Sequence, residues 1–502
     1  MNSQFKKFSD AAAVLFKHTL FKNSSWGIIS QGGQTIFISL FFVIIARQYS
    51  TTIFADYLVA SSMYQLVAAV SALGLGQWFI REVVQAEDKR AFINRFVKMQ
   101  IYFGVGFYFV NIVLAYLFYS NPFVRILIVI FGANIVFDNI INAIKHLNVA
   151  DFEQKKTFII LTLESFLKLL VASLLFVYPV SVIIFSAILV LVRFITLNLF
   201  LKYGSSQQVS LTSLWHSRIR ARDVGTLLRA NWPFIIIGGV SIINWRIATI
   251  IIAKTLTAVD VANYEISFKI FSIAQILPII ISTTVFPLLI KLLVAGDQQK
   301  FRDFYRQSYL YYLLFGLLAY TFVYTFVDQL MPLIFGAKYA LTGGYAKQMF
   351  LTILVFPTAL LQANVLIALK LEKQDMLFNT AALLVNVLFC LVGLHFVKSL
   401  YIVNYSIFAS FLVFHLLQDV LLVRKQVTTL RHVLSFYGIS VGAILGFIGL
   451  TKILFAPLVF ALCWGLCGVW LFGYRKRGTP APGLRFAVDG SGYEAATGRG
   501  EG

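Results

Sequence analysis

Four ionisable residues stand out because they lie one helical turn apart within long apolar stretches. Glu164 and Lys168 lie in TFIILTLESFLKLL, and Glu265 and Lys269 repeat the spacing in VANYEISFKIFSIAQILPIIISTTVFPLLIK. Side chains four positions apart share one helix face, so each acid can neutralise its lysine. Ionisable groups in apolar helices otherwise face a cavity or a partner. Lys168 and Lys269 are therefore either substrate-binding cations or members of intrahelical pairs, and both acids are candidates for ion coupling.

Arg246 is the clearest candidate for binding an anion. It lies near the middle of an apolar stretch, INWRIATII, with no acid three or four positions away. Its guanidinium either faces a central cavity, where it would match phosphate oxygens in a bidentate fork, or pairs with Glu164 or Asp138 on another helix. Arg193 lies nearer the end of its own apolar stretch, so we interpret it as mainly structural and able to extend toward lipid headgroups.

A polar stripe occurs on one otherwise apolar helix. Asn134, Asp138, Asn142 and Lys145 follow each other at helical spacing. The stripe is expected to line water or a polar substrate, or to form a buried hydrogen-bond network between helices. Asn134, Asp138 and Asn142 are therefore further substrate-binding candidates, and Asp138 is also a candidate for ion coupling.

Two prolines, Pro278 and Pro287, lie in the same apolar stretch as Lys269. Each removes a backbone hydrogen bond and bends the helix, which a membrane bundle tolerates where neighbours satisfy the freed carbonyl. A bent helix with a lysine near one end is a candidate moving wall of a passage.

The composition places these residues in a membrane. The chain has 502 residues, of which 59% are hydrophobic and 13% are charged, and its mean hydropathy is +0.82. One soluble core could not bury that much apolar surface. Apolar stretches of about 20 residues are long enough to cross a bilayer as helices, and a helix satisfies its own backbone in lipid. The sequence predicts an all-α polytopic membrane protein.

Hydropathy predicts fourteen transmembrane helices. They are expected at 26–46, 57–79, 99–119, 126–145, 158–178, 181–201, 232–253, 266–290, 308–328, 348–369, 377–397, 402–423, 433–451 and 454–473. With the N-terminus inside, 29 Lys and Arg residues fall in inner segments and 7 in outer loops, as the positive-inside rule requires. Both termini are therefore expected in the cytoplasm. The net charge of +21 then reflects topology and attraction to membrane lipids, and no nucleic-acid partner is expected.

Two similar stretches indicate an internal duplication. ARQYSTTIFADY and AKTLTAVDVANY lie 207 residues apart and align Ser50 with Thr257 and Tyr57 with Tyr264. Each is expected to be the outer loop after the first helix of a six-helix block. Because six is an even number, both blocks cross the membrane in the same sense, as parallel repeats around a central cavity. The predicted organisation is a cytoplasmic amphipathic N-terminus at 1–25, an N-lobe at 26–201, a cytoplasmic linker at 202–231, a C-lobe at 232–423, a helix pair at 424–473, and a disordered tail at 474–502. The composition of this tail is also typical of vector-derived sequence.

Several blocks resemble a known family. They are KNSSWGIISQGGQTIFISLFFVIIARQYS followed by FADY, SALGLGQWFIRE, ANYEISFKIFSIAQILPIIISTTVFPLL, and PLIFGAKYALTGGYAKQMFLTILVFPTALLQANVLIALKLEKQD. In order and spacing they resemble the lipid-linked oligosaccharide flippases, of the O-antigen and polysaccharide type, in the multidrug/oligosaccharidyl-lipid/polysaccharide exporter superfamily. The basic Lys269, Pro287, and Gly74 and Leu75 before Arg81 match the family pattern. Many relatives carry an acid near Arg246, so an ion-coupling role is not carried over to that position.

The resemblance implies a function. Such a protein flips a polyprenyl-pyrophosphate-linked oligosaccharide to the outer leaflet of the bacterial inner membrane by alternating access, for surface polysaccharide assembly. It also implies that the eighth predicted helix lines the passage, that the last two helices help form a groove for the polyprenyl tail, and that polysaccharide polymerase machinery is a candidate partner. No cofactor is expected, and H⁺ or Na⁺ coupling would use Glu164, Asp138 or Glu265.

Two other functions compete with this one. An ion-coupled multidrug exporter of the same superfamily would need an acidic cavity, whereas Arg246, Lys269 and Lys168 favour anions. A membrane glycan polymerase or ligase would need a large outer loop, but the longest predicted one, about 329–347, is short. The sequence has no GxxxxGK[ST] or HExxH motif, and its three cysteines lie in apolar stretches. The chain is therefore not expected to be an enzyme or to bind a metal.

Overall fold

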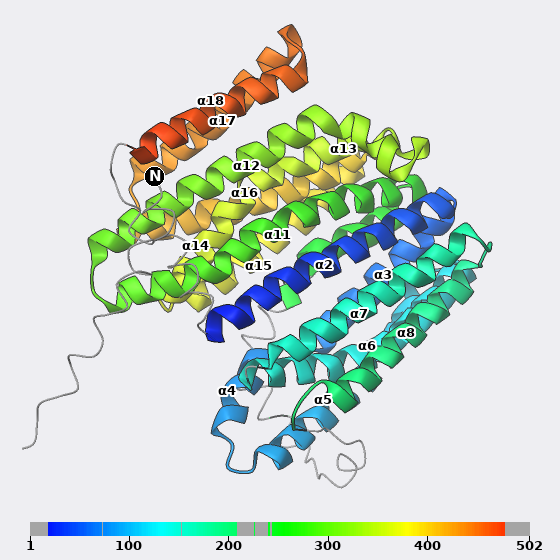
Figure 1. Ribbon diagram of the computed structural model, residues 1–502. Coiled ribbons are helices and arrows are strands. Elements are labelled where there is room, and N and C mark those ends of the chain that lie inside the picture. The colour runs from blue at the N-terminus through cyan, green and yellow to red at the C-terminus, as the bar shows by residue number, and fades with distance from the viewer. Residues whose placement is uncertain are drawn as a thin grey trace, which may run out of the picture.

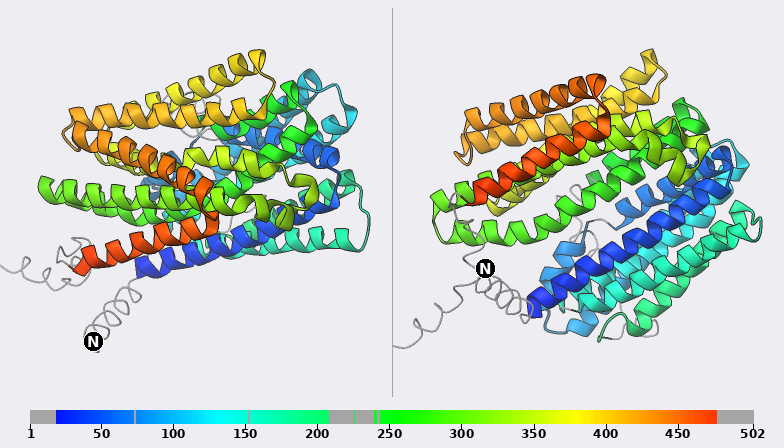
Figure 2. Two further views of the ribbon diagram at one scale, coloured as in Figure 1. Left: turned by 90° about the horizontal axis from the view of Figure 1, so that it is seen from above. Right: turned by 45° about the horizontal axis from the view of Figure 1, so that its top comes forward.

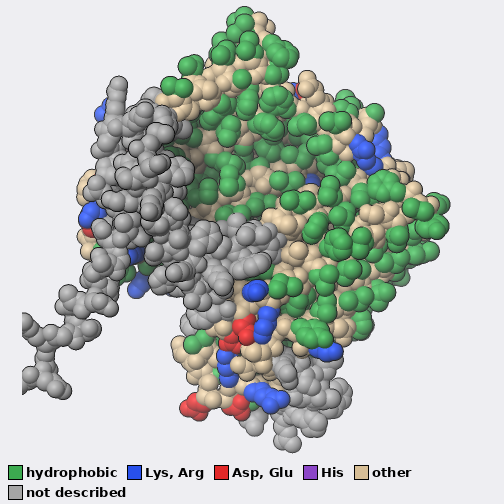
Figure 3. Space-filling view, in the orientation of Figure 1, with side chains coloured by type: hydrophobic (Ala, Val, Ile, Leu, Met, Phe, Trp, Pro, Cys, Tyr) green, Lys and Arg blue, Asp and Glu red, His purple; other side chains and the backbone are tan. Residues whose placement is uncertain are grey.

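The computed structural model describes residues 19–72, 74–151, 153–207, 225, 239–240 and 243–476, and it is helical with no strand in these ranges. Eleven of its helices are long and apolar enough to cross a membrane, and Gly32–Gln48 and Ala456–Val469 are shorter apolar helices. Hydrophobic side chains cover most of the face shown in Figure 3, and charged ones lie mainly toward its edges. The prediction of an all-α polytopic membrane protein is confirmed.

The N-terminal helices form one packed group, coloured blue to blue-green in Figure 1. The group consists of α2 (Thr19–Gln48), α3 (Thr51–Ser71), α4 (Gly76–Gln85), α5 (Lys89–Phe118), α6 (Pro122–Ala150), α7 (Gln154–Ser173), the short turn η1 (Leu174–Phe176) and α8 (Val182–Tyr203). Helix α6 is its centre, because α3, α5 and α8 all pack against it, while α2 packs along α7.

The C-terminal helices form a second group. It consists of the helical residues 243–255, α11 (Ala258–Val294), α12 (Gln298–Phe335), η2 (Ala337–Tyr339), α13 (Thr342–Met349), η3 (Phe350–Leu354), α14 (Phe356–Ala368), α15 (Glu372–Phe396) and α16 (Leu400–Arg424). Helices α17 (Leu430–Ile453) and α18 (Ala456–Lys476) pair with each other and pack on α12 (Figures 1 and 2). The two groups meet chiefly where α3 packs against α11.

The two aligned stretches of the sequence form short turns with equivalent caps. Helix α2 ends at Gln48 and α3 begins at Thr51, so the loop expected over 46–57 is almost entirely helical. Ser50 caps α3 by accepting a hydrogen bond from the Ile53 N–H. Thr257 caps α11 in the same way, because its hydroxyl accepts a hydrogen bond from the Asp260 N–H. A hydroxyl satisfies an N–H that lacks an intrahelical partner, so both aligned residues start a helix.

The predicted helix at 57–79 is wrong at both ends. Helix α3 covers Thr51–Ser71, and the chain then turns through Gly74, whose φ of +57° favours glycine. Helix α4 follows at Gly76, where an added Cβ would lie 2.2 Å from the His146 ring. Hydropathy alone merged two helices, because a turn made of apolar residues and glycine leaves the average unchanged.

Several predicted boundaries fall near or beyond the limits of the described ranges. Helix α2 already begins at Thr19, inside the N-terminal segment predicted at 1–25. Most of the predicted linker at 202–231, part of the predicted helix at 232–253 and the tail beyond Lys476 lie outside the described residues.

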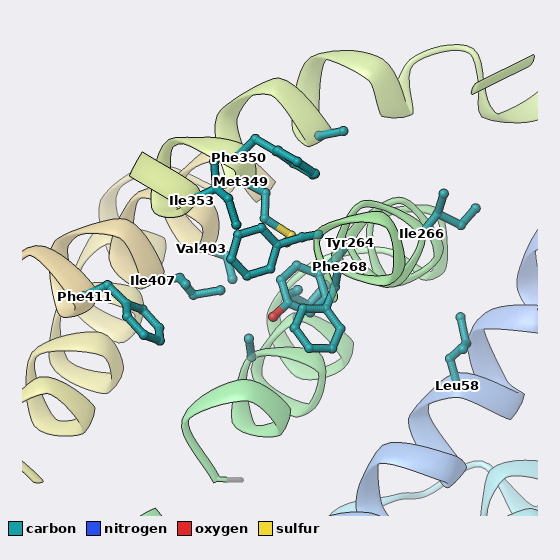
Figure 4. Packing of buried hydrophobic residues seen from close by; sticks show 14 of the residues in the cluster. Leu58, Tyr264, Ile266, Phe268, Met349, Phe350, Ile353, Val403, Ile407 and Phe411 are labelled. Atoms are coloured by element: carbon teal, nitrogen blue, oxygen red, sulfur yellow. The ribbon is translucent and has the colours of Figure 1, made fainter. Parts of the chain in front are cut away.

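Helix α11 turns two different faces to its surroundings, which positions the site. Tyr264 and Phe268 stack with ring centroids 6.2 Å apart and pack toward Met349 and Phe411 (Figure 4). Ile266 lies on the side of α11 toward α3 (Figure 4). The aromatic face holds α11 in the C-terminal group and leaves the face with Glu265 and Lys269 toward the N-terminal group.

Candidate functional site

A cavity of about 440 Å³ lies between the two helix groups. Helices α2, α3, α6, α7 and α8 form one wall, and residues 243–255 and α11 form the other. Its charged lining residues are Lys168, Arg193, Arg246, Lys269 and Glu265. Its polar lining residues are Ser61, Ser62, Tyr57, Tyr64, Gln65, Asn134 and Ser272. Phenylalanines from α2, α6 and α11, with Ile38, Leu58 and Leu189, complete it. The cavity therefore combines cations, hydroxyl and amide groups, and aromatic rings.

Arg193 binds two acids in the wall formed by the N-terminal group. Its Nε donates to Asp138 Oδ1 at 2.7 Å, and its Nη1 contacts Glu164 Oε2. Lys168 Nζ lies 2.5 Å from Glu164 Oε1, so the pair suggested by their spacing does form. The two ion pairs fit the mainly structural role predicted for Arg193, but its guanidinium lies in the cavity wall between two carboxylates and does not extend along the helix toward the headgroups.

Arg246 faces the cavity and pairs with an acid that we did not consider. Its Nη1 lies 3.5 Å from Glu265 Oε2, and its guanidinium lies 5.4 Å from the centre of the Phe268 ring. Glu265 also accepts hydrogen bonds from Thr249 and, at 3.2 Å, from Ser62 of α3. The suggested partners, Glu164 and Asp138, are bound to Arg193 instead. Glu265 thus links both helix groups.

Lys269 lines the cavity without forming an ion pair to any residue that the structure describes. The intrahelical pair with Glu265 does not form, because that carboxylate points to Arg246, Thr249 and Ser62. The Lys269 Nζ lies 5.9 Å from the centre of the Phe42 ring on α2. Its ammonium protons are therefore available to a ligand.

The polar stripe on α6 is divided among three environments. Asn134 lines the cavity, and Asp138 binds Arg193. Asn142 accepts a hydrogen bond from Lys145 at 3.2 Å and lines a separate pocket of about 160 Å³ near Gly74. Asn134 and Asn142 are eight residue steps apart, about 12 Å along the helix, so the stripe is too long for all of it to face one ligand site.

Both prolines lie inside the continuous helix α11. The Tyr312 hydroxyl donates to the Pro278 carbonyl at 3.2 Å, and Asn364 donates to Ser282 Oγ at 2.5 Å. Neighbouring helices α12 and α14 thus contact α11 at Pro278 and one turn beyond it.

Arg47 and Lys338 join the two helix groups outside the cavity, because each donates to a backbone carbonyl of the opposite group. We call these two residues the clasp. Arg47 Nε donates to the Ile334 carbonyl at 2.7 Å, and Lys338 Nζ donates to the Tyr49 carbonyl at 2.6 Å. Burial lowers the pKa of Lys338, which lies in η2 between two spanning helices. The clasp is not predictable from the sequence, because both residues fall in predicted outer loops, where a cation carries no sign of its partner.

The fold is that of transporters of the MOP superfamily. The lipid II flippase MurJ in an inward closed conformation superposes with a TM-score of 0.71 at 13% identity, covering 88% of this chain and 99% of that one. An inward-facing multidrug resistance MATE family transporter gives 0.64 at 12% identity, with 78% and 94% covered. A MOP superfamily transporter from Pyrococcus furiosus Vc1, described as having a binding pocket of reverse polarity, gives 0.56 at 13% identity, with 82% and 95% covered.

The chain belongs to the polysaccharide biosynthesis protein family, whose model matches residues 20–293. This match confirms the predicted family and covers every helix that lines the cavity. Comparison with curated protein sequences gave no match. Family and fold together describe a multi-pass membrane protein of the polysaccharide biosynthesis family with the fold seen in MurJ and MATE transporters.

Proposed function

We propose that the chain flips a polyprenyl-pyrophosphate-linked oligosaccharide from the cytoplasmic to the outer leaflet of the bacterial inner membrane, for surface polysaccharide assembly. The observation that carries this proposal is the cationic cavity between the helix groups. Four cations line it, whereas Glu265 is its one acidic lining residue among those described. A pyrophosphate headgroup needs such donors to leave water.

The arrangement of the ion pairs leaves these cations able to bind. Asp138 and Glu164 pair with Arg193 and Lys168. Neither acid lines the cavity, so both acids contact these cations from the side away from it. Arg246 and Lys168 each keep about a quarter of their side chain exposed. An entering phosphate can therefore take the N–H groups that face the cavity, with Lys269 as its principal counter-charge.

The remaining lining suits a sugar. Ser61, Gln65, Tyr64 and Asn134 offer donors and acceptors beside the aromatic rings of α2 and α6. Hydroxyl groups of a glycan require such partners once they lose water. The predicted polymerase partner, the orientation of the termini and the groove for the polyprenyl tail stay predictions.

The clasp supports alternating access. With the predicted topology, Arg47 and Lys338 hold the helix groups together on the outer side, and the substrate enters from the cytoplasmic leaflet. Separation of the two helix groups at that end would break the clasp and open the outer side.

A multidrug exporter of the same superfamily is the rival function, since MATE transporters share the fold. It would need an unpaired carboxylate to attract cationic drugs, and Glu265 is already held by Arg246 and two hydroxyl groups.

The test uses purified protein in liposomes that contain a polyprenyl-pyrophosphate glycan with a fluorescent sugar. A membrane-impermeant quencher reports the fraction in each leaflet. The wild type should equilibrate the lipid, Lys269→Ala should slow this at least 10-fold, and Lys269→Arg should retain most of it. Transport of a cationic dye without movement of the glycan lipid would replace the proposal by the exporter.

A further inference from the structure

A second cluster of ionisable groups lies among the C-terminal helices, around His415 and Asp419 of α16. His415 Nδ1 lies 3.0 Å from Asp419 Oδ2, one helical turn away, and the two side chains are only 0% and 3% exposed. Gln362 of α14 donates to Asp419 Oδ1 at 2.6 Å, and Tyr437 of α17 donates to Oδ2 at 2.9 Å. Neither His415 nor Asp419 lines the cavity described above.

Asp419 differs from the three acids that the sequence predicts for ion coupling. Asp138 and Glu164 bind Arg193, and Glu265 binds Arg246. An arginine does not release its proton in a protein, so these acids keep a permanent counter-charge. Within the described ranges, Asp419 forms an ion pair only with His415, and histidine can gain or lose a proton near neutral pH.

The hydrogen bonds around His415 indicate how many protons its ring carries. Its Nδ1 lies 2.6 Å from the Tyr437 hydroxyl, whose own proton is directed to Asp419, so Nδ1 donates. Its Nε2 lies 2.9 Å from Thr358 Oγ1, which also lies 3.0 Å from the Val355 carbonyl, so a Thr358 hydroxyl that donates to Val355 leaves its oxygen to accept from Nε2. A ring that donates from both nitrogens is an imidazolium. The geometry thus fits an imidazolium beside a carboxylate, a pair with no net charge.

Loss of one proton from this pair has a defined result. The imidazolium becomes a neutral imidazole, and the carboxylate stays, so one net negative charge lies on a buried pair. Such a charge is costly unless the surroundings change. The Tyr309 hydroxyl, 3.3 Å from Nε2, can then donate to the ring. Proton release is therefore linked to a rearrangement of the helices that bury the pair.

Every helix around the pair contributes polar groups. Those that titrate or carry charge are Tyr305, Arg306 and Tyr309 on α12, Asp375 on α15, and His432 and Tyr437 on α17. Helix α14 adds Thr358 and Gln362, which do not titrate. Asp375 accepts from Gln418 at 3.3 Å and from Asn379 at 3.1 Å. The counter-charge of Asp419 therefore depends on His415 more than on any distant group.

The helices that hold the pair also contact α11. Tyr312, one turn beyond Tyr309, donates to the Pro278 carbonyl. Asn364, two positions after Gln362, donates to Ser282. Both contacts lie on the helix whose Lys269 lines the cavity. A rearrangement around His415 can thus reach the cavity through α12 and α14.

We propose that His415 and Asp419 form the proton-binding site to which transport is coupled, in place of the cavity acids. The coupling rests on the proposed transport function, whereas the proton binding does not. His415 lies nine residues before Arg424, about 14 Å along α16 from its end. The turn between α14 and α15 and the start of α17 lie at the same end, so the proton exchanges with water there.

The first experiment is nitrogen NMR of protein labelled with ¹⁵N-histidine in lipid bilayers. The signal lost in His415→Gln identifies the ring. At pH 7 both ring nitrogens should carry protons in the wild type, and Asp419→Asn, which keeps the shape of the side chain, should convert the ring to the neutral form. A neutral His415 ring at pH 7 in the wild type, or one unchanged by Asp419→Asn, would overturn the proton-binding pair. His395→Gln, at an exposed ring, is the matched control.

The second experiment measures glycan-lipid flipping in liposomes with an imposed pH gradient. The wild type should respond to the gradient several-fold. His415→Gln and Asp419→Asn should still flip the lipid without a gradient but lose the response, and Asp303→Asn on the exposed face of α12 should keep it. An equal response in wild type and both variants refutes the coupling.

The two experiments separate the two proposals. If the wild type does not flip the glycan lipid at all, the proposed function fails, and the NMR result still decides whether the pair binds a proton. If one variant does not fold, the other decides the coupling, because each removes one member of the same pair.

Discussion

Arg246 Nη1 and Glu265 Oε2 lie 3.5 Å apart on two consecutive helices of the same cavity wall, and the same carboxylate accepts a hydrogen bond from Ser62 of the other helix group. One acid therefore both balances a cavity cation and joins the two groups across their interface.

Replacing Glu265 by glutamine tests both roles. Glutamine can keep the hydrogen bonds to Ser62 and Thr249 but cannot neutralise Arg246, so the cavity gains one positive charge. We expect a pyrophosphate lipid to bind several-fold more tightly and to be released more slowly. We also expect the free energy of unfolding to fall by about 3 kcal/mol, because one partner of a buried pair is lost. Binding can be followed by titration calorimetry in detergent, with Glu372→Gln on the surface as control. Weaker binding would mean that the carboxylate itself contacts the substrate.

Arg193 is expected to matter for stability more than any other cavity cation. Arg193→Ala leaves Asp138 and Glu164 without their shared partner, and a cost of about 3 to 5 kcal/mol is typical for breaking a buried pair. Arg193→Lys should recover only part of it, because one ammonium cannot reproduce the fork that contacts both acids. Thermal unfolding in detergent measures the effect, and Lys373→Ala at an exposed site provides the comparison. Full stability of the lysine variant would show that the fork is not needed.

Removing the clasp should shift the two helix groups apart at that end. Arg47→Ala together with Lys338→Ala removes the two cations that donate to Ile334 and Tyr49 carbonyls. If the pair contributes about 1 kcal/mol, the population of the opened form rises about 5-fold.

Spin labels at Thr52 and Leu341 in a background without cysteine can measure this opening, because both positions are exposed beside the clasp. A longer distance should appear in the double variant and not in Lys398→Ala. An unchanged distance distribution would show that the clasp does not hold the groups together.

The pH dependence of one loop can be predicted from Glu153, which lies between α6 and α7. Burial opposes its ionisation, but hydrogen bonds from Lys156 Nζ at 2.9 Å and the Ser206 N–H at 3.0 Å outweigh it and lower its pKa below 4.5. A lowered carboxyl pKa stabilises the folded loop above the unfolded pKa, and this contribution is lost as the pH falls through the folded value.

Hydrogen exchange of the Ser206 amide should therefore be slow at pH 6 and faster relative to its intrinsic rate below pH 4.5. In Glu153→Gln the protection should no longer vary with pH, while Glu87→Gln on the surface should behave as wild type. Protection of Ser206 that stays constant down to pH 3 would refute the assignment.

Local features of the site could be predicted from the sequence. The pair Glu164 and Lys168 could be predicted as one of two options, because residues four apart share a helix face, whereas the same spacing at Glu265 and Lys269 gives no pair. The apolar stretches predicted the all-α membrane class, because lipid leaves a backbone few ways to satisfy its polar groups. Arg246, Lys168, Lys269 and Asn134 were all expected at the cavity, and all line it; whether they bind substrate is a prediction still.

Contacts between distant segments were decided only by the tertiary structure. Glu265 has an equally well placed lysine one turn away, yet it pairs with Arg246, because the packing of α11 against residues 243–255 brings the guanidinium to that face. The two acids that bind Arg193 were not predicted, because hydropathy gives the depth of a residue but not the direction in which its helix turns it. The pair His415 and Asp419 was missed for the same reason. Its i,i+4 spacing is visible in the sequence, but its isolation from arginine and lysine depends on four other helices packing around α16.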